Sequence, residues 1–120
     1  MKLLYVEDDP NQQLMLTRLL KGYEVKAVRY PSDALALAPD FAPQAILLDI
    51  HLPEMTGFAL VERLRAIPQT QYSFMVALTA DNMYSSQTYL KAGFDAYLLK
   101  PFSRQALLDL LQDIQTRLLD

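Results

Sequence analysis

Apolar runs alternate with segments of helical character along the whole chain. We expect strands at about 2–6, 24–28, 45–48, 74–78 and 96–99. All but the second of these runs are largely apolar, which is typical of strands that are buried on both faces of a parallel sheet. The run at 24–28 mixes charged and apolar residues, and it therefore predicts a strand at the edge of the sheet.

A helix is expected after each strand. Pro10 suits the first turn of the first helix, and Gly22 suits the left-handed position that ends it. We expect a short second helix over 34–38 followed by a loop over 39–43, and further helices over about 58–66, 82–92 and 103–118, with Gly93 ending the fourth. Strands and helices that alternate through short loops predict an α/β fold with right-handed crossovers and helices on both faces of the sheet.

Length and composition narrow the class of protein. The 120 residues suit one domain, which we expect to span 1–120, and 52% hydrophobic residues are enough for a compact core. The chain has no cysteine, which excludes a disulfide framework and a thiolate metal site. It shows no membrane-length apolar stretch and no signal peptide, so we expect a cytoplasmic protein without membrane association. A net charge of −3 without a basic cluster argues against direct nucleic-acid binding.

The residues that follow the predicted strands carry groups suited to phosphate chemistry. The acidic triplet at 7–9 follows the first strand, Asp49 the third, Thr79 the fourth and Lys100 the fifth. All strands of a parallel sheet end at the same edge, and ligands bind beyond their carboxyl ends. We therefore expect these carboxylates, the hydroxyl and the ammonium group to meet in one pocket.

Three carboxylates in one pocket favour a bound cation. Glu7, Asp8 and Asp49 on neighbouring strand ends would repel one another unless a cation lay between them. An all-oxygen site with few ligands and room for water suits Mg²⁺. Such a metal neutralises charge during phosphoryl transfer, and an aspartate can accept the phosphoryl group as an acyl phosphate. Lys100 offers a positive charge and Thr79 a hydroxyl to the phosphoryl oxygens.

Five motifs lie along the sequence. They are Val-Glu-Asp at 6–8, Leu-Asp-x-x-x-Pro at 48–53 with Met55 and Gly57, Thr-Ala at 79–80, Ala-Gly-Phe-Asp-Ala-Tyr at 92–97, and Lys-Pro-Phe at 100–102. In combination, these motifs resemble those of the receiver domain of response regulators in two-component signalling, in particular of chemotaxis regulators. The similarity extends from 2 to about 118. The resemblance implies a flavodoxin-like, doubly wound (βα)5 fold whose five-stranded parallel sheet has the order 2-1-3-4-5.

The resemblance also implies a metal site and a phosphoacceptor. By this resemblance Asp49 is the phosphoacceptor, and Asp8 and Asp49 bind Mg²⁺ directly. Glu7 is expected to act largely through water, and the main-chain carbonyl of His51 completes the protein ligands. Asp9 is expected to lie outside this set of ligands.

Further roles follow from the same resemblance. Thr79 and Lys100 are expected to contact the phosphoryl group once it is attached. Tyr97 matches the switch aromatic of the family, which turns inward when Thr79 moves toward the phosphate. The peptide bond between Lys100 and Pro101 is expected to be cis.

The implied function is a phosphorylatable signalling switch. A histidine kinase or a histidine phosphotransfer protein would donate a phosphoryl group to Asp49, and the surface of the fourth helix, fifth strand and fifth helix would then change to control a partner protein. Such a regulator catalyses its own phosphorylation and slow dephosphorylation, but it is not an enzyme with a free substrate.

Other functions remain as alternatives. A phosphohydrolase with an aspartate nucleophile would carry a second acid two residues after Asp49, where His51 stands. A flavin-binding electron carrier would need a phosphate-cradling loop after the first strand, where the acidic triplet at 7–9 would repel the phosphate. A pseudo-receiver adaptor that signals without phosphate would have no need of the acids together with Thr79 and Lys100.

Each motif taken alone also has an ordinary structural interpretation. The acidic triplet can favour the positive end of a helix, and Asp49 can be a turn residue. Lys100 can be a solvated surface lysine. Thr79 can cap the following helix, although Asp81 or Asn82 is the better candidate for that cap.

Overall fold

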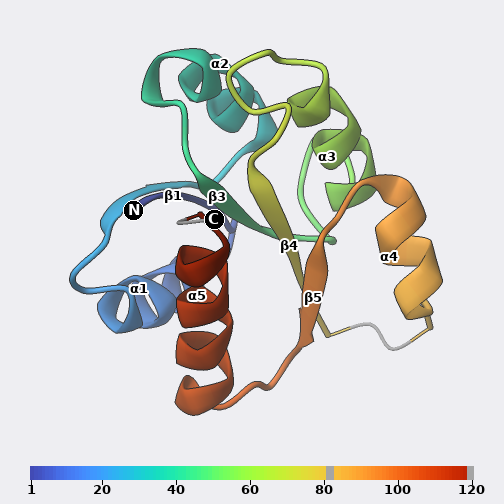
Figure 1. The fold of residues 1–120 in the computed structure, drawn as a ribbon. Coiled ribbons are helices and arrows are strands. Elements are labelled where there is room, and N and C mark those ends of the chain that lie inside the picture. Colours follow the sequence, from blue (N-terminus) through green and yellow to red (C-terminus); the bar gives the residue numbers. More distant parts are fainter. Residues whose placement is uncertain (81–82, 119–120) are drawn as a thin grey trace.

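In the computed structural model, residues 1–80 and 83–118 are described, and strands and helices alternate along them. Figure 1 shows this succession. The elements are β1 (Lys2–Val6), α1 (Pro10–Leu19), β2 (Glu24–Val28), α2 (Pro31–Phe41), β3 (Ala45–Asp49), α3 (Gly57–Arg65), β4 (Phe74–Thr79), α4 (Ser86–Ala92), β5 (Ala96–Leu99) and α5 (Arg104–Leu118).

The strands form one parallel sheet in the order β2-β1-β3-β4-β5. This is the order that the resemblance implied, and the polar strand β2 lies at the edge as its mixed composition predicted. β1 pairs with both β2 and β3, which sets the residues after β1 beside those that end β3. The carboxyl ends of all strands therefore face the same edge, where the candidate site lies.

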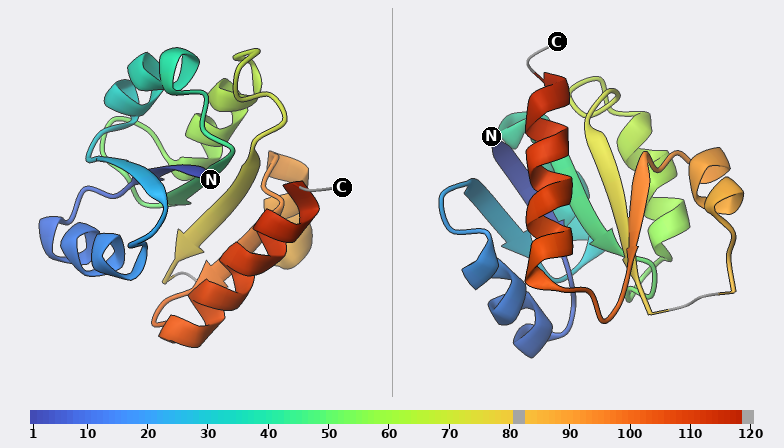
Figure 2. Two further views of the ribbon diagram at one scale, coloured as in Figure 1. Left: turned by 60° about the vertical axis from the view of Figure 1, so that its left-hand side comes forward. Right: turned by 60° about the horizontal axis from the view of Figure 1, so that its bottom comes forward.

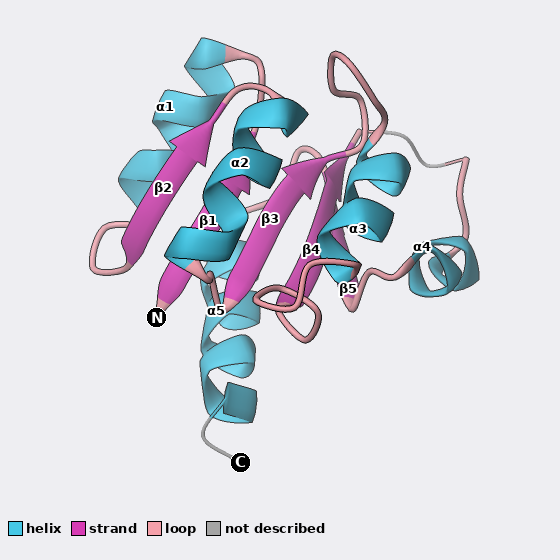
Figure 3. Ribbon diagram, turned by 90° about the horizontal axis from the view of Figure 1, so that it is seen from above, coloured by secondary structure: helices cyan, strands magenta, loops and turns pink. Residues whose placement is uncertain are grey.

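Helices cover both faces of the sheet. Figure 2 shows α5 crossing one face with α1 beside it, and Figure 3 shows α2 and α3 on the opposite face. Along β1, successive side chains enter the two cores in turn: Leu3 and Tyr5 pack with α1 and α5, whereas Leu4 and Val6 pack with α2, α3 and α4. Among the described residues, no helix has both the length and the apolar character needed to cross a membrane.

Helix α2 is longer than expected. The prediction of a helix over 34–38 followed by a loop over 39–43 is wrong, because α2 continues through Pro39 to Phe41. Ala34, Ala38 and Phe41 share one buried face of the helix, and Phe41 is only 5% exposed. Burial of the aromatic ring stabilises the last turn although Pro39 cannot donate a helical hydrogen bond.

Helix α4 is shorter than expected. It begins at Ser86 rather than near 82, and Ser85 caps it by accepting a hydrogen bond from the amide of Thr88 at 3.3 Å. It ends at Gly93, as predicted, where φ is 116°. The caps proposed at Asp81 and Asn82 lie outside the described residues.

Candidate active site

Three carboxylates gather at the carboxyl edge of the sheet. Glu7 and Asp8 follow β1, and Asp49 is the last residue of the neighbouring strand β3. Each residue offers one carboxylate oxygen, and these oxygens all lie within 4.8 Å of one another. The structure thus brings together the acids that the sequence placed on neighbouring strand ends.

The acidic triplet divides between the cluster and helix α1. The Glu7 amide donates to the carbonyl of Val28 at 3.0 Å, which continues the pairing with β2 and holds Glu7 at 1% exposure. The Asp9 carboxylate instead accepts from the amides of Asn11 and Gln12, at 2.9 and 3.3 Å. Asp9 is therefore the N-cap of α1, so the helix-start interpretation holds for the third acid.

The loop after Asp49 is closely folded against it. The Asp49 Oδ1 atom accepts from the amide of His51 at 3.0 Å, and the Gly57 amide donates to the carbonyl of Ile50 at 2.8 Å. A Cβ atom at Gly57 would lie 2.5 Å from the Asp49 carbonyl oxygen. Since no real side chain tolerates that distance, glycine is required for helix α3 to begin here.

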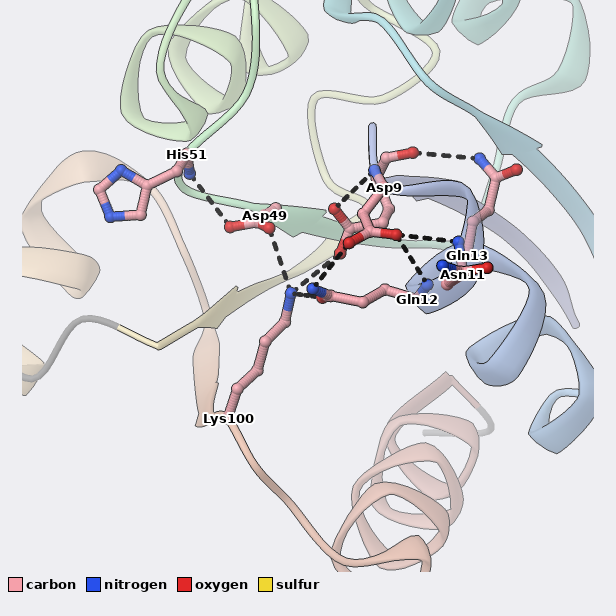
Figure 4. Close-up of polar contacts among 8 residues, drawn as sticks. Asp9, Asn11, Gln12, Gln13, Asp49, His51 and Lys100 are labelled. Atoms are coloured by element: carbon pink, nitrogen blue, oxygen red, sulfur yellow. Dashed lines mark hydrogen bonds and ion pairs between the residues drawn. The ribbon is translucent and has the colours of Figure 1, made fainter.

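Lys100 connects the carboxylates to helix α1. Its Nζ atom donates to Glu7 Oε1 at 2.9 Å, to Asp49 Oδ2 at 3.1 Å and to Gln12 Oε1 at 2.6 Å. Figure 4 shows Lys100 reaching Asp49 and Gln12. An ammonium group has three N–H donors, so these contacts occupy all of them. Sequence reasoning missed Gln12, whose polar side chain in the first turn of α1 carries no motif.

The electrostatics of the cluster favour a further cation. Burial raises the pKa of Glu7, Lys100 opposes this rise, and the charge of Asp49 adds to it. Burial works against the charge of Lys100, yet Glu7 and Asp49 outweigh that effect and raise the pKa of Lys100. One ammonium group thus faces three carboxylates, which leaves the pocket with excess negative charge.

Thr79 ends β4 next to Lys100. The threonine is fully buried, and its carbonyl accepts from the Lys100 amide at 2.7 Å. The peptide bond between Lys100 and Pro101 is cis, which confirms the expectation from the resemblance.

The other predicted residues lie at the margin of the cluster. His51 is exposed, and its ring lies apart from the Asp49 carboxylate while its amide donates to it (Figure 4). Tyr97 lies on β5 and is 37% exposed. Its ring stacks on that of the buried Tyr89, with 4.8 Å between centroids and 19° between ring planes. The structure therefore shows Tyr97 in a half-exposed position against α4.

Comparison with known proteins defines the class. The family model of the response regulator receiver domain matches residues 3–112. Chemotaxis response regulator CheY4 of Vibrio cholerae has a similar structure, with a TM-score of 0.86, 31% identity, and coverage of 94% of this chain and 97% of that chain. The receiver domain of the sensor histidine kinase PA1611 from Pseudomonas aeruginosa PAO1, which has a magnesium ion coordinated in its active-site cleft, gives a TM-score of 0.85 at 33% identity, over 93% and 94% of the two chains.

The chain belongs to the response regulator receiver domain family, with the CheY-like flavodoxin fold. It is therefore the phosphorylatable switch domain of two-component signalling, and a receiver domain is in general a switch rather than a conventional enzyme.

Curated relatives differ in what accompanies this domain. An uncharacterized 14.6 kDa protein of Leptolyngbya boryana is 34% identical over 93% of this chain and 88% of its own length. The transcriptional regulatory protein HprR of Escherichia coli is 39% identical over 90% of this chain but only 48% of its own length. The chain thus spans about half the length of the transcriptional regulators it matches.

Proposed function

We propose that Asp49 is the phosphoacceptor of a receiver domain that spans 1–120, and that its donor is the phosphohistidine of a histidine kinase or a histidine phosphotransfer protein. The observation that carries this proposal is the cluster of Glu7, Asp8 and Asp49 with Lys100 bonded to two of its members. Asp49 is 9% exposed, so the pocket holds its carboxylate while leaving an opening for the donor.

The donor set of the pocket fits Mg²⁺. Three carboxylates with oxygens within 4.8 Å of one another supply hard oxygen ligands, and one ammonium group leaves their charge incompletely balanced. We assign Asp8 and Asp49 as direct ligands, Glu7 as a ligand acting largely through water, and the His51 carbonyl as the remaining protein ligand. When bound, Mg²⁺ supplies positive charge that offsets the charge on the transferring phosphoryl oxygens.

The chain's own groups then account for the transfer. A carboxylate oxygen of Asp49 attacks phosphorus, forming an O–P bond while the N–P bond to the donor imidazole breaks and the imidazole retains that electron pair. Lys100, now 3.1 Å from Asp49 Oδ2, exchanges this contact for a phosphoryl oxygen. The Thr79 hydroxyl donates a second hydrogen bond to the phosphoryl group. Water later hydrolyses the acyl phosphate to aspartate and inorganic phosphate.

The proposed output is a change on the face of α4, β5 and α5. Leu90, Tyr97 and Leu99 are 52%, 37% and 44% exposed there, so apolar surface is already available to a partner protein. Movement of Thr79 toward the phosphoryl group would let Tyr97 turn inward and change this face. We propose a cytoplasmic site of action, because ATP, from which phosphohistidine is made, is supplied there.

Phosphorylation by acetyl phosphate tests the site. With Mg²⁺, the intact protein should gain one phosphoryl group, measured by mass spectrometry, and Asp49→Asn should gain none. Asp9→Asn is the matched control, because asparagine also caps a helix and Asp9 lies outside the cluster. Equal phosphorylation of Asp49→Asn would contradict the proposal. Repeated turnover of p-nitrophenyl phosphate would instead support the phosphohydrolase.

The role of Lys100 needs a separate measurement. Lys100→Ala should weaken the conformational response to beryllofluoride, a mimic of the acyl phosphate, more than it weakens Mg²⁺ binding. Both quantities can be followed by the chemical shifts of Tyr97 and its neighbours. Equal loss of the two on titration would count against a contact between Lys100 and the phosphoryl group.

A further inference from the structure

A cavity of about 500 Å³ opens between helix α1 and the segment that follows β5. Its apolar walls come from Met15, Leu16 and Leu19 of α1 and from Pro101 and Phe102. The volume falls within the range of small-molecule sites, which are mostly apolar with a few polar groups. The cavity adjoins the acidic cluster, because Lys100 contributes to both.

A tyrosine hydroxyl in this cavity has no hydrogen-bond partner among the described residues. Tyr5 of β1 lines the cavity and is 1% exposed, and its hydroxyl makes no hydrogen bond with any residue of the described segments. In those same segments, every fully buried side-chain nitrogen or oxygen has a partner. The Tyr5 hydroxyl is therefore not sealed in the core, and the opening available to it is the cavity.

The other polar side chains that line the cavity, Gln12 and Lys100, already make hydrogen bonds within the protein. The side-chain oxygen of Gln12 accepts a hydrogen bond from Lys100 at 2.6 Å, and Lys100 donates its other two hydrogen bonds to Glu7 and Asp49. Among the described lining side chains, the Tyr5 hydroxyl is the polar group that makes no hydrogen bond within the protein, so we assign ligand selection to it. The nearby carboxylates make the surroundings negative, which disfavours an anionic ligand.

From these contacts we propose that the cavity is a binding site for a neutral, largely apolar small molecule with one accepting oxygen, such as an alkyl ketone that carries a phenyl group, and that this oxygen receives a hydrogen bond from Tyr5. The apolar body lies against the side chains of α1 and Phe102, and the oxygen reaches inward to the hydroxyl. A small molecule fits better than the surface of a protein, because Tyr5, which carries the donor, is only 1% exposed. Binding at this site does not require phosphoryl transfer, although Lys100 lines the cavity as well as the acidic cluster.

Titration with 4-phenyl-2-butanone, followed by amide and methyl chemical shifts, tests the site without Mg²⁺ or a phosphodonor. We expect saturable binding of one molecule, with shifts at Leu16 and Phe102. Tyr5→Phe keeps the ring and removes the hydroxyl, and it should weaken binding about tenfold, equivalent to about 1.4 kcal/mol. The anion 3-phenylpropionate, of similar size, should bind at least about tenfold more weakly than the ketone.

Two neighbouring variants localise the binding. Met15 is 65% exposed and lines the cavity, so Met15→Trp should fold and cover the opening, abolishing the titration. Leu14 is 53% exposed and is not among the lining residues, so Leu14→Trp should bind the ketone as the unaltered protein does. No saturable shifts at millimolar ketone, undiminished binding by Tyr5→Phe, or equal binding of the carboxylate would each overturn the proposal, whatever the outcome of phosphorylation.

Discussion

Arg65, the last residue of α3, uses all five of its N–H donors. Nε and Nη2 donate to the carbonyl of Gly93 at 3.0 and 2.7 Å, and Nη2 also donates to Asp95 at 2.8 Å. Nη1 donates to the carbonyls of Gln71 and Ser73, at 2.9 and 2.7 Å. One side chain thus connects the end of α3, the loop before β4 and the turn between α4 and β5, and its removal should loosen all three.

The stability that should be lost when Arg65 is replaced follows from the type of these hydrogen bonds and from the exposure of the groups that form them. A hydrogen bond from a charged donor contributes about 1.5–3 kcal/mol when it is buried. The Arg65 and Asp95 side chains are 25% and 41% exposed, so their ion pair adds no more than about 1 kcal/mol. Water can replace part of the bonding to the carbonyls. Arg65→Ala should therefore lower the free energy of unfolding by about 2–4 kcal/mol, and Arg65→Lys by about 1–2 kcal/mol, because one ammonium group cannot reach all four partners.

Urea unfolding followed by circular dichroism measures both effects. Arg63→Ala is the matched control, since Arg63 lies exposed on the same helix and should change the free energy of unfolding by less than about 0.5 kcal/mol. Amide hydrogen exchange should rise at Met75, whose amide donates to Asp95. If Arg65→Ala matched the control in urea, the hydrogen bonds of Arg65 would have no net stabilising effect, and this reasoning would be refuted.

Three further predictions concern the residues around the site. Glu54 has φ of 70° and accepts two hydrogen bonds from Ser32. Glu54→Ala loses these bonds and keeps the backbone strain, whereas Glu54→Gly loses the bonds and relieves the strain, so the glycine variant should be more stable in urea than the alanine variant by about 1 kcal/mol. Equal stability of the two variants would contradict this. In Gly57→Ala the added Cβ atom would clash with the Asp49 carbonyl oxygen, which should lower the free energy of unfolding by about 1–3 kcal/mol and slow phosphorylation by acetyl phosphate. An unchanged rate of phosphorylation would contradict this prediction. Burial raises the pKa of Glu7, so the native state binds its proton more tightly than the unfolded state does, and stability should fall as pH rises above the usual range of a glutamate. Glu7→Gln should remove that fall in Mg²⁺-free buffer, and parallel pH profiles of the two proteins would argue against it.

The sheet was predictable because its signals are local. Apolar runs marked the strands, and the charged residues of β2 marked the edge, where one side of a strand lacks a neighbour. Parallel strands end at one edge, so the gathering of Glu7, Asp8, Asp49 and Lys100 followed from their places after the runs. The strand order did not follow from the runs themselves, and it came from the resemblance.

The limits of two helices were set by tertiary contacts. Pro39 is a local signal for a helix end, but Phe41 reaches the core only if the helix continues past it. Tyr84 packs edge-on against Phe58, with 5.1 Å between ring centroids, before the cap at Ser85. No local pattern reveals either contact, because in each case the partner lies on another element.

The residues that connect distant segments are the hardest to foresee, for a chemical reason. The acids and Lys100 carry charges that phosphoryl chemistry requires, so their residue types alone suggest a role. Gln12 meets Lys100 across 88 positions of the chain, and Arg65 meets Gly93 across 28. The acceptor at Gly93 is a main-chain carbonyl, which every residue possesses, so the sequence holds no matching partner for Arg65. Such contacts are specified by the fold as a whole, and they become visible only when the sheet has brought the segments together.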